Sequence, residues 1–293
     1  MIHHHTVGDA RITGVIEYSG PTHDPAFLYP AVDKAERDAV LKANASWLAP
    51  NHYVPHMDRL IVTIQLWVVH AGGNVIVIDT GVGNRKPRPA ERMDRLNTLV
   101  MPWLEAAGAG PSQVTHVVMT HMHTDHVGWN TVEKDGNWVP TFPKARYLFS
   151  KKELDYWLAE NDKAALPPIV DSVIPIVEAK RCDLITSDHA VDDTVVLLPT
   201  PGHTIDHYAV ALGRGGKDAV ITGDLIHSPL QAKYTELAMR VDYDSQQGAD
   251  TRRKFLETYC DTNTLCCFAH FPTPSRGYLK RWGNGFRCEY VTD

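Results

Sequence analysis

The stretch from His121 to His126, HMHTDH, constrains this chain more than any other feature. It places three imidazoles and one carboxylate directly after an apolar run, residues 114–120 (VTHVVMT), which predicts a buried strand. Imidazole nitrogen and carboxylate oxygen are ligands that Zn²⁺ and similar ions prefer, and each imidazole keeps a second nitrogen for a supporting hydrogen bond. The alternative is a polar turn that happens to be rich in histidine, but a structural histidine usually stands alone. The stretch therefore predicts a metal site at a strand end.

Length and composition predict one globular domain over residues 1–293. The chain is long enough to bury a substantial core, and its hydrophobic fraction of 43% and charged fraction of 22% are ordinary for a soluble protein. No shift in composition marks a boundary. Residues 20–58 stand outside the regular alternation of elements, so we expect them to form a lid over the site or part of a homodimer contact. A packed surface helix is the alternative.

Charge and cysteine usage restrict the partners and the compartment. The net charge is −6 and no stripe of lysine or arginine is present, which disfavours a nucleic-acid role. No apolar run is long enough to cross a bilayer, and residues 1–9 (MIHHHTVGD) lack the pattern of an export signal. Five unpaired cysteines, of which Cys266 and Cys267 are expected in the core, fit reduced thiols. We therefore expect a cytoplasmic protein that binds neither nucleic acid nor membrane.

The three histidines of residues 3–5 are interpreted as a disordered tail or a cloning remnant and are left out of the site.

The remaining periodicities predict strands and helices in two similar runs. Strands are expected at residues 11–18, 60–70, 74–78, 114–120, 145–149, 184–186, 194–198, 208–212, 219–222, 265–269, 278–282 and 286–291, and helices at 33–48, 90–107, 151–157, 169–179 and 246–259. A run of strands, then a helix, then a strand occurs twice. This order predicts an α/β fold with two sheets packed face to face and helices outside, a four-layer αββα sandwich.

Other predicted strands also end in metal-binding residue types. His203 follows the strand at 194–198, Asp224 follows 219–222, and His270 follows 265–269. The candidate ligands are then His121, His123, Asp125, His126, His203, Asp224 and His270. Seven ligands exceed what one tetrahedral ion needs.

Two divalent cations explain this number. One would take His121, His123 and His203, the other would take Asp125, His126 and His270, and Asp224 would bridge them. Such a pair can share a water or hydroxide whose pKa falls toward neutrality. The ligand set therefore predicts a hydrolase.

The order His-x-His-x-Asp-His, Gly-His, Gly-Asp and a last His resembles the metallo-β-lactamase fold superfamily, over roughly residues 60–293. The resemblance implies the αββα sandwich, the seven residues above as ligands of two metal ions, and zinc as the expected metal. It also implies that Asp79, in the Asp-Thr-Gly turn after residues 74–78, orients a metal-binding imidazole. The long N-terminal segment and residues 222–227 (TGDLIH) look most like the branch of quorum-quenching N-acyl-homoserine lactonases and methyl-parathion-hydrolase-like enzymes.

This resemblance implies a dinuclear hydrolase that opens lactones or cleaves related esters. A hydroxide bridging the two metals would attack the carbonyl, with Asp125 and Asp224 holding it in place. The lactonases carry a tyrosine where this chain has His227, which would donate a hydrogen bond, act as a general acid or simply wall the pocket. Large apolar residues near the lid or the ligands are the candidate substrate-binding residues, and any of them could instead be core: Phe27, Leu28, Trp129, Leu230 and Tyr234.

Several alternatives share the ligand set. A glyoxalase-II-like thioesterase would need basic pocket residues, for which Arg85, Lys86 and Arg88 are the candidate cluster. An organophosphate hydrolase would use the same nucleophile on phosphorus. An iron redox protein on the same fold and a non-catalytic, metal-dependent signal binder are the alternatives outside hydrolysis.

Overall fold

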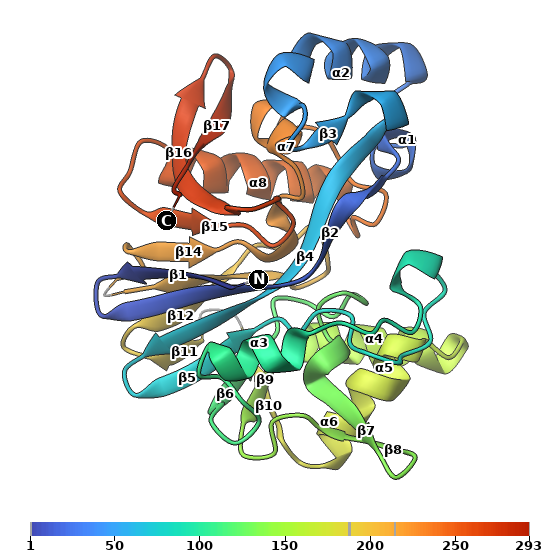
Figure 1. The fold of residues 1–293 in the computed structure, drawn as a ribbon, viewed down its shortest axis with the longest axis vertical. Helices are drawn as coiled ribbons and strands as arrows, with labels where there is room; N and C mark the ends of the chain where they lie inside the picture. The colour runs from blue at the N-terminus through green and yellow to red at the C-terminus, as the bar shows by residue number, and fades with distance from the viewer. Residues whose placement is uncertain (1, 187–188, 214, 293) are drawn as a thin grey trace.

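Two mixed β-sheets packed face to face form the centre of the molecule, a computed structural model that describes residues 2–186, 189–213 and 215–292 (Figure 1). The first sheet contains, in spatial order, β1 (Ile2–Val7), β2 (Ala10–His23), β4 (Arg59–Ala71), β5 (Asn74–Ile78), β6 (His116–Val118), β9 (Arg146–Ser150) and β10 (Cys182–Ile185), with β3 (Tyr53–Val54) paired to β4. The second contains β11 (Ala190–Asp192), β12 (Val195–Pro199), β13 (Tyr208–Leu212), β14 (Ala219–Ile221), β15 (Leu265–Cys267), β16 (Arg276–Trp282) and β17 (Gly285–Tyr290) in sequence order.

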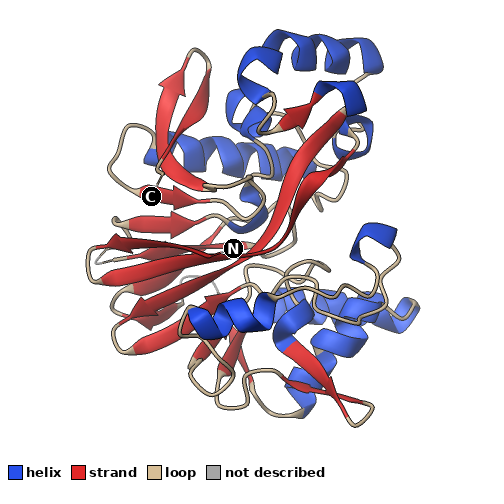
Figure 2. Cartoon of the chain, in the orientation of Figure 1, coloured by secondary structure: helices blue, strands red, loops and turns tan. Residues whose placement is uncertain are grey.

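Helices cover the outer faces of both sheets, which confirms the predicted αββα sandwich (Figure 2). The first sheet is covered by α3 (Val100–Ala106), α4 (Lys151–Lys163), α5 (Pro167–Ser172) and α6 (Ile174–Glu178), together with the hairpin β7 (Thr131–Lys134) and β8 (Asn137–Pro140). The second sheet is covered by α7 (Pro229–Lys233) and α8 (Ser245–Tyr259). Within the described part of the chain, no helix has the length and apolar character needed to span a bilayer.

The core has an inner layer between the sheets and an outer layer on each side. Successive side chains of a strand point to opposite faces, so neighbouring residues enter different layers. On β4, Val69 packs between the sheets while Val68 packs under α3. On β14, Ile221 packs between the sheets while Val220 packs under α8. These two-sided strands need apolar residues at every position, which is why they appear in the sequence as continuous apolar runs.

Residues 90–107 do not form the single helix that their periodicity predicted. The structure has a short 3₁₀ turn, η2 (Glu91–Met93), and then α3, with a non-helical segment between them. The side chain of Asn84 accepts a hydrogen bond from the amide of Thr98 (2.7 Å), and the amide of Arg95 donates to the carbonyl of Lys86 (2.8 Å). Bonds to this neighbouring loop therefore replace the helical ones.

The predicted helix over residues 169–179 is divided into α5 and α6. Pro175 has no amide proton, so it cannot continue the hydrogen-bond ladder of α5, and it takes a place in the first turn of α6 instead.

The sequence-based prediction lacked the strands β1, β3, β7, β8 and β11. Residues 2–7 form β1, antiparallel to β2, and His4 Nδ1 lies 2.8 Å from Thr13 Oγ1. The interpretation of this segment as a disordered tail is therefore wrong. The hairpin β7–β8 turns at Asp135 and Gly136, both with positive φ, which is a turn signal visible in the sequence.

The N-terminal excursion forms α1 (Pro25–Leu28) and α2 (Lys34–Leu48), and η1 (Pro55–Met57) follows β3. Figure 1 shows α1, α2 and β3 beside α7, above one end of the sheets. Leu28 and Leu41 share a buried cluster with Leu230 and Met239 from the second half of the chain. The side chain of Asn44 also donates to the hydroxyl of Tyr234 (3.0 Å). The excursion is thus fixed to the segment that contains α7.

Candidate metal centre

The predicted ligands lie at one edge of the sheets because parallel strands end there. Strand β5 is parallel to β6, and β14 is parallel to β15. The chain beyond β6 contains the HMHTDH motif, and η4 (Gly223–Leu225) beyond β14 contains Asp224. Gly128 allows the motif to approach the turn after β5, because a Cβ there would lie 1.9 Å from the carbonyl carbon of Val82. The local fold therefore brings distant segments to one point.

The first ligand group contains His121, His123 and His203 around one oxygen of Asp224. Oδ2 of this carboxylate lies 3.6 Å from His121 Nε2 and 3.4 Å from His203 Nε2. His203 Nε2 lies 3.0 Å from His123 Nδ1. Two ligands about 2.0 Å from one tetrahedral ion lie about 3.3 Å apart, so these separations have the size that a shared cation requires.

The second group surrounds the other oxygen of Asp224. Oδ1 lies 2.9 Å from His270 Nε2 and 3.1 Å from His126 Nε2. Oxygens of Asp125 lie 3.8 Å and 3.9 Å from these two nitrogens. All seven predicted ligands are thus brought together, and the two oxygens of Asp224 face different groups. This is the partition expected of a bridging carboxylate.

Unsatisfied buried atoms indicate that the residues fit a metal. His121 Nε2, His126 Nε2 and Asp224 Oδ1 are inaccessible to solvent and make no aligned hydrogen bond. A buried polar atom without a partner is costly, whereas a bound cation would satisfy all three. The clustered donor atoms of each group lie within 4.8 Å of one another.

Supporting hydrogen bonds turn the Nε2 atoms toward the centre. His126 Nδ1 lies 2.9 Å from Asp79 Oδ2, His203 Nδ1 lies 2.8 Å from Asp242 Oδ1, and His270 Nδ1 donates to the carbonyl of Thr63 (2.7 Å). Each Nδ1 therefore carries a proton, so Nε2 is the ring atom that would bind a cation, after giving up any proton of its own.

Asp79 reaches a further ligand through a hydroxyl. It accepts hydrogen bonds from the amide and the hydroxyl of Thr120, both at 2.8 Å, and this hydroxyl lies 3.0 Å from His121 Nδ1. Because the hydroxyl donates to Asp79, it accepts from His121. One carboxylate thus orients an imidazole in each ligand group.

The charges of the centre depend on burial and on close neighbours. Burial raises the pKa of Asp224, but the surrounding imidazoles, His126 and His270 first, outweigh it and hold that pKa well below its usual value. Burial lowers the pKa of His203, but Asp224 and Asp242 outweigh it and raise that pKa to about 9. Asp224 is therefore ionised at neutral pH, as a bridging ligand must be.

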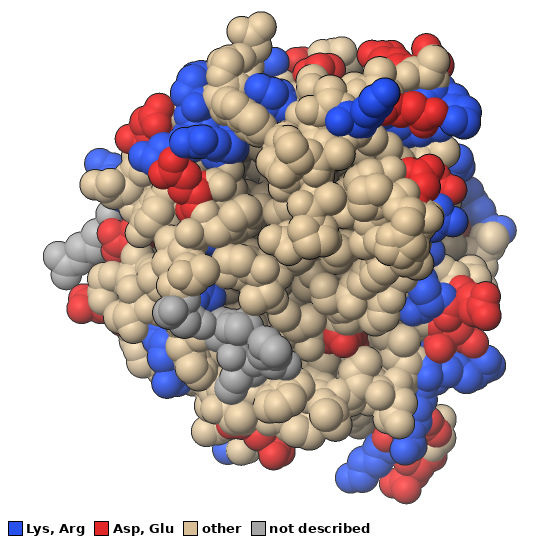
Figure 3. Space-filling model, turned by 45° about the horizontal axis from the view of Figure 1, so that its top comes forward, with Lys and Arg blue, Asp and Glu red and all other residues tan. Residues whose placement is uncertain are grey.

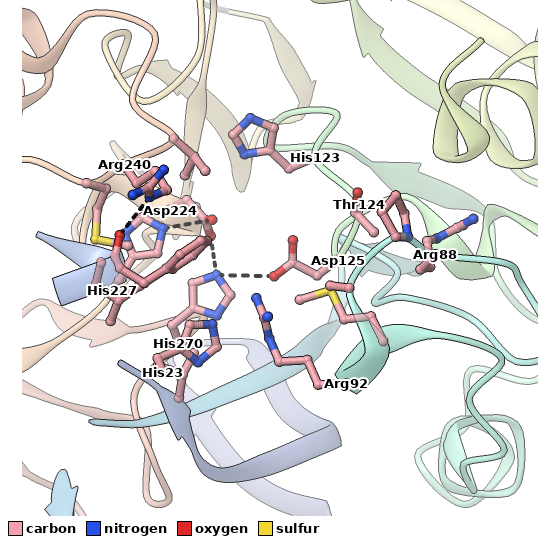
Figure 4. A pocket seen from close by; sticks show the side chains of 18 residues that line it. His23, Arg88, Arg92, His123, Thr124, Asp125, Asp224, His227, Arg240 and His270 are labelled. Carbon is pink, nitrogen blue, oxygen red and sulfur yellow. Dashed lines mark hydrogen bonds and ion pairs between the residues drawn. The ribbon is translucent and has the colours of Figure 1, made fainter. Parts of the chain in front are cut away.

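A cavity of about 300 Å³ opens onto the centre, and Figure 4 shows the side chains that line it. Part of its wall consists of ligands, with the Asp125, Asp224 and His270 side chains turned toward one another. Phe27 and Leu28 line it, as predicted from the sequence. The remaining lining residues are His23, Val62, Arg88, Pro89, Ala90, Arg92, Met93, His123, Thr124, His227, Met239, Arg240 and Val241.

Trp129, Leu230 and Tyr234 do not line this cavity, which corrects their assignment as substrate-binding residues. Trp129 is buried, and its indole Nε1 donates to the carboxylate of Glu17 (2.7 Å). Leu230 packs with the N-terminal excursion, and Tyr234 is the acceptor for Asn44 described above. Nearness in sequence to a ligand or a lid did not place these side chains in the pocket.

His227 lines the cavity and contacts the bridging carboxylate. Its Nε2 lies 3.1 Å from Asp224 Oδ2, and its ring stacks on that of His270 with centroids 4.9 Å apart. Burial lowers its pKa to about 4 despite the opposing effect of Asp224. The imidazole is thus neutral at pH 7 and retains one N–H donor.

Two of the basic residues considered for a thioesterase, Lys86 and Arg88, contact the carboxylate of Asp171. Arg88 makes two hydrogen bonds to Asp171, at 2.6 Å and 3.0 Å, and Lys86 contacts the same carboxylate at 3.4 Å. Both side chains are buried. Asp171 therefore offsets one of these two positive charges, and Arg88 still lines the cavity.

Sequence reasoning missed the residues that loops bring to the site. Asp242 lies between short segments without a motif, and Arg92 was placed on a helix that does not form. His23 ends β2, and burial lowers its pKa to about 3. Only the clustering of charged and histidine residues in the fold identifies them.

On the face shown in Figure 3, lysine and arginine side chains are interspersed with aspartate and glutamate around a centre that is mostly uncharged, with acidic atoms visible in its hollow. That face shows no continuous field of positive charge.

Comparison with known proteins agrees with the fold. Residues 62–270 match the family model of the metallo-beta-lactamase superfamily, and the chain belongs to this superfamily. A probable metallo-hydrolase of Mycobacterium tuberculosis is 24% identical over 233 residues, which cover 70% of this chain and 73% of that protein.

Two solved structures share the complete architecture. One is described as the hydrolase AbOPH in the beta-lactamase superfamily, with a TM-score of 0.80, 22% identity and coverage of 100% of this chain and 98% of that one. The other is AidC, a dizinc quorum-quenching lactonase in complex with its product, with a TM-score of 0.78, 21% identity and the same coverage.

Proposed function

We propose that this protein is a metal-dependent hydrolase that uses two divalent cations, with zinc as the expected ion, to open lactones or cleave related carboxylic esters. The observation that carries the proposal is the position of Asp224, whose two oxygens face separate groups of three ligands. Bound there, a pair of divalent cations lowers the pKa of a water molecule and polarises a carbonyl group.

The protein groups have distinct roles in this proposal. Asp125 and Asp224 face the cavity and hold the attacking oxygen by accepting its proton or hydrogen bond. His227, neutral and beside Asp224, donates its one N–H from Nε2 to that carboxylate and so helps to hold it in place. Phe27 and Leu28 exclude water from the apolar side of the cavity.

Relatives support the choice of reaction. The mycobacterial protein is named a probable metallo-hydrolase, and AidC is named a lactonase with an N-acyl-homoserine product. The thioesterase alternative has less support, because the cations of Lys86 and Arg88 are engaged by Asp171.

We also propose that residues 20–58 act as a lid within a single domain. They contribute Phe27 and Leu28 to the cavity and are held by contacts with Leu230 and Met239.

A turnover panel on zinc-loaded protein tests the proposed function. The panel contains N-hexanoyl-homoserine lactone, an aryl ester, a thioester, a phosphotriester and a β-lactam. We expect hydrolysis of the lactone or the ester, and its loss in Asp224→Ala and His203→Ala. His56→Ala, which changes an exposed histidine outside the site, is the matched control and should retain the rate. Absence of turnover on the whole panel, or full rates and metal content in either ligand variant, would contradict the proposal.

His227→Asn tests the hydrogen-bond role separately. We expect kcat to fall by about 100-fold, the scale of a lost proton-transfer or hydrogen-bonding group, while both ions stay bound. Loss of a metal ion from this variant would instead identify His227 as a ligand.

A further inference from the structure

We propose that Arg92 binds a carboxylate on the substrate, so that the preferred substrate is an acidic ester with a negative group a short distance from the scissile carbonyl. The inference rests on the proposed ester hydrolysis and adds the class of ester to it.

The position of Arg92 is the first observation. Its side chain lines the cavity with Asp125 and His270, and Figure 4 shows it extending toward these two ligands. Its Nε is inaccessible to solvent and has no hydrogen-bond partner among the described residues. An N–H that is both desolvated and unpaired carries a free-energy cost that a ligand oxygen would remove.

The other two lining arginines, Arg88 and Arg240, have partners for part of the guanidinium, although Nε of Arg88 is buried and unpaired like that of Arg92. Arg88 is held by two hydrogen bonds to Asp171. Arg240 donates from Nε to the carbonyl of Phe27 (3.1 Å), and its guanidinium lies over the ring of that residue. No ion pair is found for Arg92 in the ranges that the structure describes. Arg92 is therefore the lining arginine left for a ligand.

The charge balance of the cavity favours an anion. Among its lining residues the acidic ones are Asp125 and Asp224, and both belong to the metal ligands. His23 also lines the cavity, but an imidazole is neutral or cationic and supplies no negative charge to Arg92. A carboxylate matches the planar donors of arginine and can form two parallel hydrogen bonds, which a neutral carbonyl cannot do.

Apolar side chains in the same cavity as Arg92 suit a substrate with a short apolar spacer. Leu28, Val62, Met93 and Met239 line the same cavity of about 300 Å³. An acyl chain of a few methylene groups would contact these side chains, with its scissile carbonyl at the ligands and its carboxylate at Arg92.

Two matched esters test the proposal on the zinc-loaded full chain. Mono-4-nitrophenyl glutarate and 4-nitrophenyl pentanoate differ only in a terminal carboxylate in place of a methyl group. In Arg92→Met we expect KM for the glutarate ester to rise about tenfold or more, on the scale of a lost charge-assisted pair, with kcat changed less than twofold. For the pentanoate ester, which has no second charged end, we expect a smaller rise in KM, so that the preference for the glutarate ester falls about tenfold.

Arg95→Met is the matched control, because it removes the same charge from an exposed residue that pairs with Asp94. It should leave both esters unaffected. An equal loss on the two esters in Arg92→Met, or a loss of the same size in Arg95→Met, would overturn the proposed carboxylate contact.

A binding measurement separates this proposal from the proposed function. Calorimetry on the zinc-loaded protein compares glutarate with pentanoate, which share one carboxylate and differ in the second. The preference for glutarate should be about tenfold in the wild type and should disappear in Arg92→Met. If neither ester is hydrolysed but this preference is found and then lost in the variant, ester hydrolysis is wrong and the Arg92 contact stands. No preference for glutarate in the wild type would overturn the Arg92 contact.

Discussion

At the scale of single residues, two carboxylates orient the imidazoles of the candidate metal centre. Asp79 supports His126 directly and His121 through Thr120, and Asp242 supports His203. Metal affinity depends on such partners because they fix both the tautomer and the ring orientation.

Asp242→Asn should weaken the first metal site specifically. One oxygen of Asp242 accepts a hydrogen bond from His203 Nδ1, and the other accepts one from the backbone amide of Met239 at 2.7 Å. Asparagine has an NH₂ group in place of one of these oxygens, so one of the two hydrogen bonds is lost. We expect zinc affinity of the group containing His203 to fall about 10- to 100-fold. Competition with a chelating indicator measures this change. Asp244→Asn, two residues away at the N-cap of α8, is the control, and equal affinities in all three proteins would refute the supporting role.

The sequence indicated that the seven candidate ligands would lie together, because their residue types stand at strand ends in a recognisable order, and the structure brings them together. It did not predict Asp242, which belongs to no motif, or Arg92, which the periodicity of residues 90–107 placed on a helix that does not form. Both depend on loop conformations that only long-range packing determines.

At the scale of elements, short helices and turns attach the site to the sheets. The carboxylate of Glu17, on β2, accepts hydrogen bonds from the amide of Gly83 after β5 and from Trp129 beyond the HMHTDH motif. One side chain thereby links three segments around the centre.

Periodicity predicted the long strands well, but it overestimated the helix at residues 90–107, where apolar residues at helical spacing pack without helical bonds.

Glu17 should make stability depend on pH. Burial raises its pKa above the ordinary 4.5, although hydrogen bonds from Val82, Trp129 and Gly83 oppose this. A raised folded pKa means that its contribution to the free energy of unfolding is complete below 4.5 and declines as pH rises through the folded pKa. The Glu17→Gln variant has no titrating group at this position. Its free energy of unfolding, relative to that of the wild type, should therefore rise between about pH 4 and pH 7.

Urea unfolding at several pH values measures the difference between the two proteins. Glu133→Gln, on an exposed position of β7, should show a nearly constant difference from wild type. A constant difference for Glu17→Gln as well, or one that moves in the opposite direction, would contradict the direction of this shift.

The corrected position of Tyr234 makes a prediction about α2. Tyr234→Phe removes the hydroxyl that accepts from Asn44, so we expect the free energy of unfolding to fall by about 1 kcal/mol with kcat and KM unchanged within twofold. Phe27→Ala removes a cavity wall and should raise KM without this loss of stability, because the side chain is 43% exposed. A raised KM in Tyr234→Phe would contradict this prediction and would indicate that Tyr234 contacts the substrate.

At the scale of the whole molecule, the sandwich concentrates ligands from distant parts of the sequence at one edge. The four-layer order could be predicted from two runs of apolar strands and amphipathic helices, because each sheet needs a covering layer on both faces. The cavity could not be predicted, since its wall combines α1, η2, the ligand loops and residues 239–241.

The number of cations that hydrolysis requires tests the central claim most directly. Zinc is titrated into chelator-treated protein, and bound zinc and the hydrolysis rate of 4-nitrophenyl pentanoate are measured on the same samples. Because Asp224 faces two ligand groups, we expect two bound ions per chain and a rate that reaches its maximum only with the second. A full rate with one ion bound, or with none, would contradict the dinuclear centre.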